Sequence, residues 1–276
     1  MVMIRTLAAA DLPFGHLPPP FHLLLFSTDS TMVQQADAAG IDGIIVDWED
    51  RGKDVRQAGA DTEINHDTRA DLKRVRAISR APIICRVNAT CESTAEEIEA
   101  AIACGATEVL LPMVRAASEV DAVIELVGGR CGVGILVETV AAVERARDFG
   151  QLPLARVYVG LNDLAIERRS ASIFEAITDG TVDRLREIFS VPFGFGGLTL
   201  PDRGHPVPCR LLIDEMVGLR CQFSFLRRSF HRDIRGRPVS EGLRLIRGAL
   251  ADAHSRLGSQ VAHDHDVLKA VVMARV

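Results

Sequence analysis

Several short apolar runs of this sequence are followed by charged or amide side chains. The types and spacing of these side chains could support catalysis. They follow the runs at 43–46, 81–85, 131–137 and 156–161, and they are Asp47, Glu49, Asp50, Arg86, Asn88, Glu138, Asn162 and Asp163. A carboxylate that follows a buried run needs a cation, hydrogen-bond donors or a raised pKa to offset its loss of water. These residues therefore predict a site that binds a cation and an anionic substrate.

Two of these carboxylates, Glu138 and Asp163, follow consecutive apolar runs. Two oxygen ligands suit Mg²⁺ or Mn²⁺, because these hard ions keep positions for water and substrate. Arg86 offers a planar pair of donors that can hold a carboxylate or an enolate oxygen. The alternative is a structural salt bridge between Glu138 and Arg86, which buried sites also contain.

The elements that must position these residues are short apolar runs that alternate with segments of helical composition. The predicted strands are 21–27, 43–46, 81–88, 106–114, 131–139, 156–163, 191–197 and 221–229. The predicted helices are 28–39, 67–79, 94–104, 116–127, 140–148, 207–219, 241–256 and 259–274, and a partly helical segment reaches 189. This alternation predicts an α/β fold, a (β/α)8 TIM barrel of parallel strands. An open doubly wound sheet competes with it, but no GxGxxG follows the first strand.

A TIM barrel brings the carboxyl ends of its strands to one mouth, where such folds keep their chemistry. We expect one domain, 1–276, with an N-terminal arm at 1–20 and a C-terminal helical extension at 259–276. Cys85 precedes Arg86 and is expected to point into the helix layer. His263 and His265 are expected to be solvated, as His-Asp pairs near a terminus usually are.

Composition limits the class of protein. Of the 276 residues 47% are hydrophobic and 25% are charged, which suits a large globular core rather than a disordered chain. A net charge of -5 and no basic block with aromatics argue against nucleic acid, which leaves a small molecule as the expected partner. Six cysteines without a CxxC pair, and no apolar stretch of membrane-span length, predict a cytoplasmic protein with reduced thiols and no membrane partner.

The runs at 191–197 and 221–229 predict the opposite wall of the mouth. Loops after the seventh and eighth strands of such barrels often bind phosphate. We expect Gly196, Gly197, Arg228 and Ser229 to hold an anionic group of the substrate. Alternatively, the glycines turn a corner and the arginines pair with surface carboxylates.

A long polar loop follows the run at 43–46 and contains His66. Long ordered loops are often functional and can close over a site. His66 is a candidate for proton transfer, because histidine most often has that role. Alternatively, His66 caps the helix that follows.

A series of motifs resembles the HpcH/HpaI aldolase and citrate lyase beta-subunit superfamily. The motifs are AGIDGIIVDWED, RVN, GATEVLLPMV, ILVET and VGLNDL, in that order between Phe26 and Leu164. The resemblance implies a pyruvate-type TIM barrel that uses a divalent metal to make or break a carbon-carbon bond next to an enolate. It implies that the metal ligands are Glu138 and Asp163, that the arginine steadying the substrate oxygen is Arg86, and that the substrate site includes Pro112. It also implies a homo-oligomer, a trimer or a hexamer.

The motif at 47–50 departs from one branch of this superfamily. The HpaI-type aldolases carry the letters DGEH where this chain has DWED, so Asp50 replaces the histidine of acid-base work. The form DxED is closer to the citrate lyase and malyl-CoA lyase branch. That branch usually continues with Ala-Val or Gly-Val and a proline before its lysine, whereas RGK follows here at once. The branch and the general base therefore stay open.

Together these residues predict a divalent-metal aldolase or lyase that acts on a 2-oxo acid. Glu138 and Asp163 are expected to hold the Mg²⁺ or Mn²⁺, and Arg86 to stabilise the enolate. The three acids of DWED are expected to order water at the metal and to supply the base. Two alternatives remain open: a lyase or thioesterase that acts on a CoA ester, and a barrel that binds a metabolite without turnover.

Overall fold

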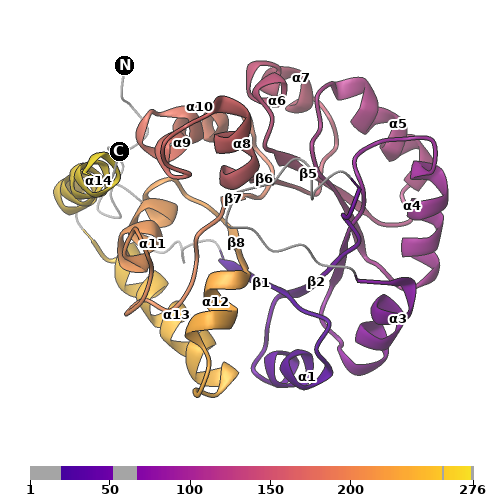
Figure 1. Ribbon diagram of the computed structural model, residues 1–276, viewed down its shortest axis with the longest axis horizontal. Helices are drawn as coiled ribbons and strands as arrows, with labels where there is room; N and C mark the ends of the chain where they lie inside the picture. Colours follow the sequence, from indigo (N-terminus) through magenta and orange to yellow (C-terminus); the bar gives the residue numbers. More distant parts are fainter. Residues whose placement is uncertain (1–19, 52–66, 257, 275–276) are drawn as a thin grey trace, which may run out of the picture.

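In the computed structural model, eight parallel strands form a nearly closed barrel surrounded by helices (Figure 1). The structure describes residues 20–51, 67–256 and 258–274. The strands are β1 (His22–Phe26), β2 (Gly43–Asp47), β3 (Ile83–Arg86), β4 (Glu108–Leu111), β5 (Gly132–Val137), β6 (Arg156–Val159), β7 (Phe193–Phe195) and β8 (Phe223–Leu226). Successive strands are neighbours, and β8 also pairs with β1. The predicted (β/α)8 barrel is confirmed.

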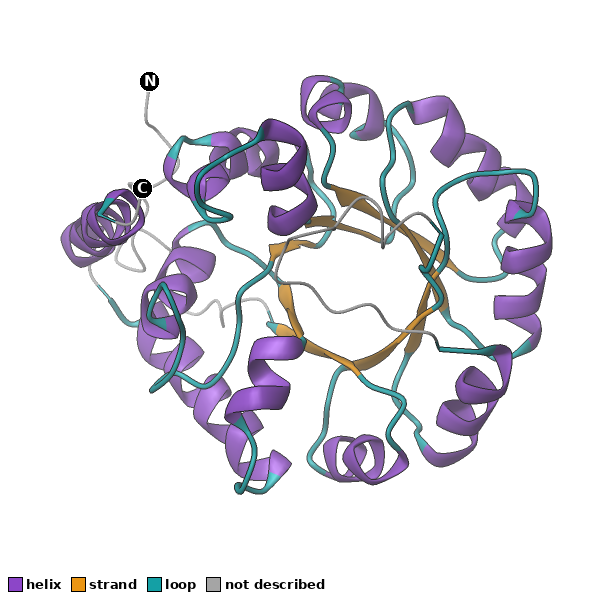
Figure 2. Cartoon of the chain, viewed as in Figure 1, coloured by secondary structure: helices purple, strands orange, loops and turns teal. Residues whose placement is uncertain are grey.

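Helices connect successive strands and cover the outside of the barrel (Figure 2). They are α1 (Ser30–Ala38), α3 (Arg69–Ile78), α4 (Thr94–Ala103), α5 (Ala117–Val127), α6 (Val140–Glu144), α7 (Ala146–Phe149), α8 (Leu161–Arg168), α9 (Glu175–Thr178), α10 (Thr181–Ile188), α11 (Cys209–Gly218), α12 (Arg228–Asp233), α13 (Val239–His254) and α14 (Gly258–Met273). Local sequence signals mark their ends. Thr68 and Asp71 form a capping box at the start of α3, and Gly128 ends α5 with φ of 57°.

After β6 and β8 a helix begins at residues that were predicted to belong to the strand. Helix α8 starts at Leu161, so Asn162 and Asp163 lie in its first turn rather than at the end of a strand. Helix α12 starts with Arg228 and Ser229, which also lie in a first turn. Both turns still lie at the carboxyl end of the barrel.

Side chains alternate between the inside of the barrel and the layer under the helices, as the period of a strand requires. Cys85 lies in the outer layer, as predicted. Glu108 and Arg156 are the first residues of their strands and form an ion pair at 2.6 Å at the amino end of the barrel. The apolar cluster inside consists of Leu24, Phe26, Ile45, Ile84, Leu110, Leu136, Tyr158, Phe223 and Phe225.

Strands β7 and β8 end the strand order and meet at a seam with few hydrogen bonds. The Gln222 N–H donates to the Phe193 carbonyl oxygen at 2.9 Å, and the Ser224 hydroxyl donates to the Phe195 carbonyl oxygen at 2.7 Å. The other neighbouring strands pair in parallel register over three or four residues. The seam is therefore the weakest join of the barrel.

The C-terminal helix α14 packs against α11 of the same chain (Figure 1). Leu268 and Val272 are buried, and His265 Nδ1 lies 3.1 Å from Glu215 Oε2. The prediction that His265 is solvated is therefore wrong, because this face of α14 turns towards α11. His263 is exposed, as predicted.

The cysteines and the lengths of the helices bear on two predictions made from composition. All six cysteines are free thiols, as predicted. Among the described residues, no helix has both the length and the apolar character needed to span a membrane.

Candidate active site

A cavity of about 780 Å³ lies at the carboxyl end of the strands. Most of its wall comes from β5 to β8 and from the segments that follow them. Its polar lining consists of Arg86, Glu138, Tyr158, Asn162, Asp163, Arg169, Ser170, Thr199, His205, Arg227, Arg228, Ser229 and Arg232. The cavity thus joins the acidic pair predicted on one wall to the glycines and arginines predicted on the other.

Arg86 is fixed by two acids, Asp47 at the end of β2 and Glu49 just after it. Its Nε donates to Asp47 Oδ1 at 2.8 Å, and its Nη2 donates to Asp47 Oδ2 at 2.6 Å. Its Nη1 lies 3.0 Å from Glu49 Oε2, and all three side chains are buried. Burial alone would lower the pKa of Arg86, but the two carboxylates outweigh it and raise the pKa, so the guanidinium stays charged. The partners of Arg86 are therefore Asp47 and Glu49, rather than the Glu138 of the predicted salt bridge.

Asp47 is in turn held by Asp67, which precedes α3. The Asp47 N–H donates to Asp67 Oδ2 at 2.9 Å, and the Thr28 hydroxyl donates to Asp67 Oδ1 at 2.9 Å. Arg227 also approaches Asp47, with 3.5 Å between its Nη2 and Oδ2. The segments after β1, β2 and β8 thus meet around Asp47: its backbone is held by the Asp67 carboxylate, and its side chain lies between Arg86 and Arg227.

The position of the Glu138 side chain is set by the segments after β4 and β6. The Met113 N–H donates to its Oε1 at 2.9 Å, from a backbone with φ of 55° that side chains rarely adopt. Gly160 leaves room on the other side, because a Cβ there would collide with the Glu138 carboxylate. Pro112 is buried beside Met113 and does not line the cavity, so the structure does not bring it to the predicted substrate site.

The surroundings of the Glu138 carboxyl favour a bound cation, as its pKa indicates. Burial, and next the nearby charge of Asp163, raise the pKa of Glu138 to about 8. Within the described ranges, no group of three or more His, Cys, Asp or Glu side chains is placed to hold a metal ion. A pair of carboxylates is still enough for Mg²⁺ or Mn²⁺, which keep several water ligands. The donor set therefore fits the predicted ion.

Comparison with known families agrees with this geometry. The sequence matches the family model described as HpcH/HpaI aldolase/citrate lyase over residues 21–172. The chain belongs to this family. The match includes Arg86, Glu138 and Asp163, and membership indicates a lyase.

Solved structures with the same barrel resemble this HpcH/HpaI family member. RipC from Yersinia pestis is 15% identical with a TM-score of 0.58, over 87% of this chain and 98% of RipC. The citrate synthase SbnG is 16% identical with a TM-score of 0.58, over 79% of this chain and 90% of SbnG. At these identities the likeness shows the fold alone. No curated protein matches the chain in sequence.

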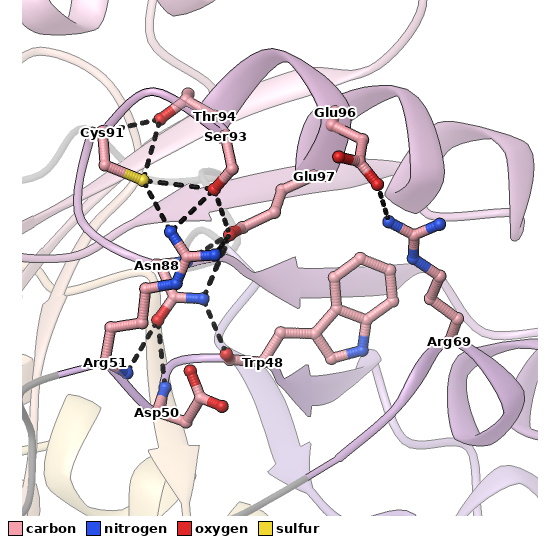
Figure 3. Close-up of polar contacts among 10 residues, drawn as sticks. All are labelled: Trp48, Asp50, Arg51, Arg69, Asn88, Cys91, Ser93, Thr94, Glu96 and Glu97. Carbon is pink, nitrogen blue, oxygen red and sulfur yellow. Dashed lines mark hydrogen bonds and ion pairs between the residues drawn. The ribbon is translucent and has the colours of Figure 1, made fainter.

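Asn88 shapes the DWED segment of this HpcH/HpaI family member (Figure 3). Its Oδ1 accepts from the N–H groups of Asp50 at 3.1 Å and Arg51 at 3.0 Å, and its Nδ2 donates to the Trp48 carbonyl oxygen at 3.1 Å. Asp50 itself is exposed and does not line the cavity. His66 lies outside the described residues. The predicted roles of Asp50 and His66 in proton transfer stay predictions.

The opposite wall brings together the residues predicted to bind an anion. Gly196, Gly197, Arg228 and Ser229 all line the cavity. Packing explains why glycine is needed at two of these positions. A Cβ at Gly196 would lie 2.7 Å from Tyr158 Oη, and Gly197 has φ of 105°. Arginines outnumber carboxylates on this wall, which suits an anionic ligand.

Sequence reasoning missed several residues of the cavity, among them Arg169 and Tyr158. Arg169 ends α8 with φ of 56°, a strained conformation for a side chain that lines a cavity, and no sequence signal marks it. Tyr158 lies inside RVYV, where period-two alternation places it on the same side as Glu138 and Gly160. That alternation is the sequence signal that could have revealed Tyr158.

The raised pKa of Glu138 predicts that cation binding depends on pH. Below about 8 the carboxyl keeps a proton, and this proton competes with Mg²⁺ for the same oxygens. The same raised pKa means that the cation-free protein loses stability as the pH rises from 4.5 to about 8, because the buried acid must ionise. We expect Mg²⁺ to raise Tm more at about pH 9 than at about pH 6, measured by calorimetry. An equal rise at both pH values would contradict the competition.

Proposed function

We propose that this family member is a divalent-metal-dependent carbon-carbon lyase, an aldolase that acts next to the pyruvate-type enolate of a 2-oxo acid. One observation carries the proposal: a buried pair of acids, Glu138 and Asp163, faces the same cavity as a charged Arg86. The three groups have the charges that a 2-oxo acid and its enolate require. Membership of an aldolase/citrate lyase family supports the reaction class.

The two acids are the proposed ligands of Mg²⁺ or Mn²⁺. When bound, the ion supplies Lewis acidity to the carboxylate and keto oxygens of the substrate. Glu138 keeps its position through the Met113 N–H, which holds one carboxylate oxygen. Asp163 lies in the first turn of α8 and is buried, so it changes position little.

Arg86 is the proposed partner of the developing enolate oxygen. Asp47 and Glu49 fix the plane of its guanidinium, so little reorganisation is needed when negative charge forms on the substrate. These two acids then act by orienting Arg86, in addition to any role in ordering water. For proton transfer the sequence predicted a water ordered by Asp47, Glu49 or Asp50, with His66 as a further candidate, and this stays the proposal.

The test is an assay of the purified protein with Mg²⁺. We expect cleavage of free 4-hydroxy-2-oxo acids and exchange of the methyl protons of pyruvate for deuterium, both abolished by excess chelator. Cleavage of malyl-CoA or citramalyl-CoA alone would favour the CoA-ester lyase instead. Ligand binding without exchange or cleavage would indicate a barrel that binds a metabolite without turnover.

Arg228 is proposed to hold a second anionic group, together with Gly196, Gly197 and Ser229. Arg228→Ala is expected to raise KM by about tenfold for a substrate with a distal carboxylate or phosphate, because a charge-assisted hydrogen bond is lost. KM for a substrate without that group should not change. Arg235 is exposed and does not line the cavity, so Arg235→Ala is the matched control. An unchanged KM for the anionic substrate would contradict the assignment.

The same proposal includes the assembly. The resemblance implied a homo-oligomer, a trimer or a hexamer, and we retain it as a prediction. Light scattering of the purified protein measures its mass in solution.

A further inference from the structure

Tyr158, the only tyrosine of the chain, stands inside the barrel on β6. Its side chain is 8% exposed, and its ring stacks on Phe225 with 3.7 Å between the centroids and 14° between the planes. Phe223 packs against it as well, at 6.0 Å. Because two rings hold it, the phenol has one direction in which its hydroxyl can point.

The hydroxyl of Tyr158 points to the layer of the acidic pair. Tyr158 pairs in register with Leu136 and Gly194, so its backbone lies two residues below Glu138 and Gly196 along the strands. The length of the side chain makes up this difference, because Tyr158 Oη lies 2.7 Å from the place of a Cβ at Gly196. The residue lines the cavity beside Arg86, Glu138 and Arg227.

No residue within the described ranges forms a hydrogen bond with this hydroxyl. The hydroxyl is not among the fully buried side-chain atoms that lack a partner in the described part of the chain, so it keeps some exposure into the cavity that Tyr158 lines. Gly196 keeps the space next to the hydroxyl clear of a side chain. A hydroxyl on a rigid, mostly buried ring that lines the cavity is placed for a ligand.

The charge state of Tyr158 defines what it can offer. Burial raises the pKa of the phenol, against the opposing effect of Arg227 and Arg86. The hydroxyl therefore stays protonated at neutral pH. It can donate a hydrogen bond to a substrate oxygen, and it is a poor base.

We propose that Tyr158 is a further catalytic residue, whose hydroxyl donates a hydrogen bond to the oxygen on carbon 4 of the 2-oxo acid. This inference rests on the proposed function. In the proposed function the carboxylate and keto group of the substrate lie at Glu138, Asp163 and Arg86. From there the cavity continues past Tyr158 towards the wall of β7 and β8. The substrate oxygen that follows these two groups along this path is the one on carbon 4.

The role in the reaction follows from the movement of electrons. In condensation, carbon 3 of the enolate forms a bond to the aldehyde carbon, and the π pair of the carbonyl moves to its oxygen. That oxygen takes up one proton, which balances the proton that the pyruvate methyl group lost. Tyr158 stabilises the charge on this oxygen while it keeps its own proton. Cleavage runs through the same state in reverse.

The single tyrosine allows a test that does not need turnover. Protein labelled with ¹³C at the tyrosine ζ carbon gives one tyrosine resonance, and Tyr158→Phe removes it. We compare 2,4-dioxopentanoate with 2-oxopentanoate, which lacks only the oxygen on carbon 4, in the presence of Mg²⁺. We expect the resonance to shift with the first ligand and to stay nearly unchanged with the second.

Binding and kinetics complete the test. Tyr158→Phe is expected to bind 2,4-dioxopentanoate about tenfold more weakly, and 2-oxopentanoate within about twofold of wild type, because one hydrogen bond is lost. Cleavage should fall while exchange of the pyruvate methyl protons continues. Equal shifts with both ligands, or no shift with either although calorimetry detects binding, would overturn the role of Tyr158. Absence of binding and of exchange in wild type would overturn the proposed function, and this inference with it.

Discussion

Glu138→Gln is expected to remove Mg²⁺ binding and to lower kcat/KM for cleavage by about a hundredfold or more, since several kcal/mol of charge stabilisation are lost. Glutamine keeps the size of the side chain and can still accept the Met113 N–H. It is neutral, so it also removes the cost of burying a charge next to Asp163. Without Mg²⁺ at high pH the variant should therefore be more stable than wild type. Calorimetric titration with Mg²⁺ and thermal unfolding measure the two effects.

Glu167→Gln is the matched control for this variant. Glu167 lies on the same helix as Asp163, pairs with Arg115 at 2.9 Å and does not line the cavity. Its replacement should leave Mg²⁺ affinity and kcat/KM within about twofold, because such surface pairs contribute little. Full activity of Glu138→Gln, or of wild type in excess chelator, would refute the metal assignment.

Arg86→Lys is expected to lower kcat/KM by about a hundredfold, mainly through kcat, while the protein stays folded. The guanidinium binds Asp47 through two nitrogens and reaches Glu49 with the third. A lysine ammonium keeps the charge, but it cannot hold both acids and face the substrate in a fixed plane. Steady-state kinetics separate this loss from weaker binding, which would change KM instead.

Arg156→Lys is the control for replacing a buried, ion-paired arginine by lysine. Arg156 pairs with Glu108 at 2.6 Å at the amino end of the barrel, away from the cavity. The same exchange there is expected to lower the free energy of unfolding by about 1–3 kcal/mol and to leave kcat within about twofold. If both lysine variants lose activity equally, Arg86 supports the fold and does not act on the substrate.

Residues that end apolar strands were predictable from the sequence. Glu138, Asp163 and Arg86 were found because a charged group after a buried run needs a reason to be there. The barrel then brings them to one mouth, so fold and cavity followed from the same pattern. Arg228 was predicted from its place after the eighth strand, where such barrels often bind anions, although the boundary between strand and helix was misplaced by a few residues.

Pairing between side chains was not predictable, because it depends on register. Asp47 and Arg86 lie directly opposite each other in the ladder of β2 and β3. That register turns an acid expected to order water into one that holds an arginine. The burial of His265 also depends on a tertiary contact, the packing of α14 on α11. Neither fact can be read from spacing along the chain.

The seam between β7 and β8 makes the barrel unequally stiff. From β8 through β1 to β7, each strand is held to the next by a regular ladder, whereas β7 and β8 rely on a few hydrogen bonds such as that from Gln222 to Phe193. Local opening favours the part of a protein with the fewest such bonds. Arg86 and Glu138 lie on or directly after strands joined by regular ladders, whereas Gly196 and Arg228 follow β7 and β8, the two strands at the seam. Local opening is therefore expected first on the side of the cavity that holds Gly196 and Arg228, while Arg86 and Glu138 keep their spacing.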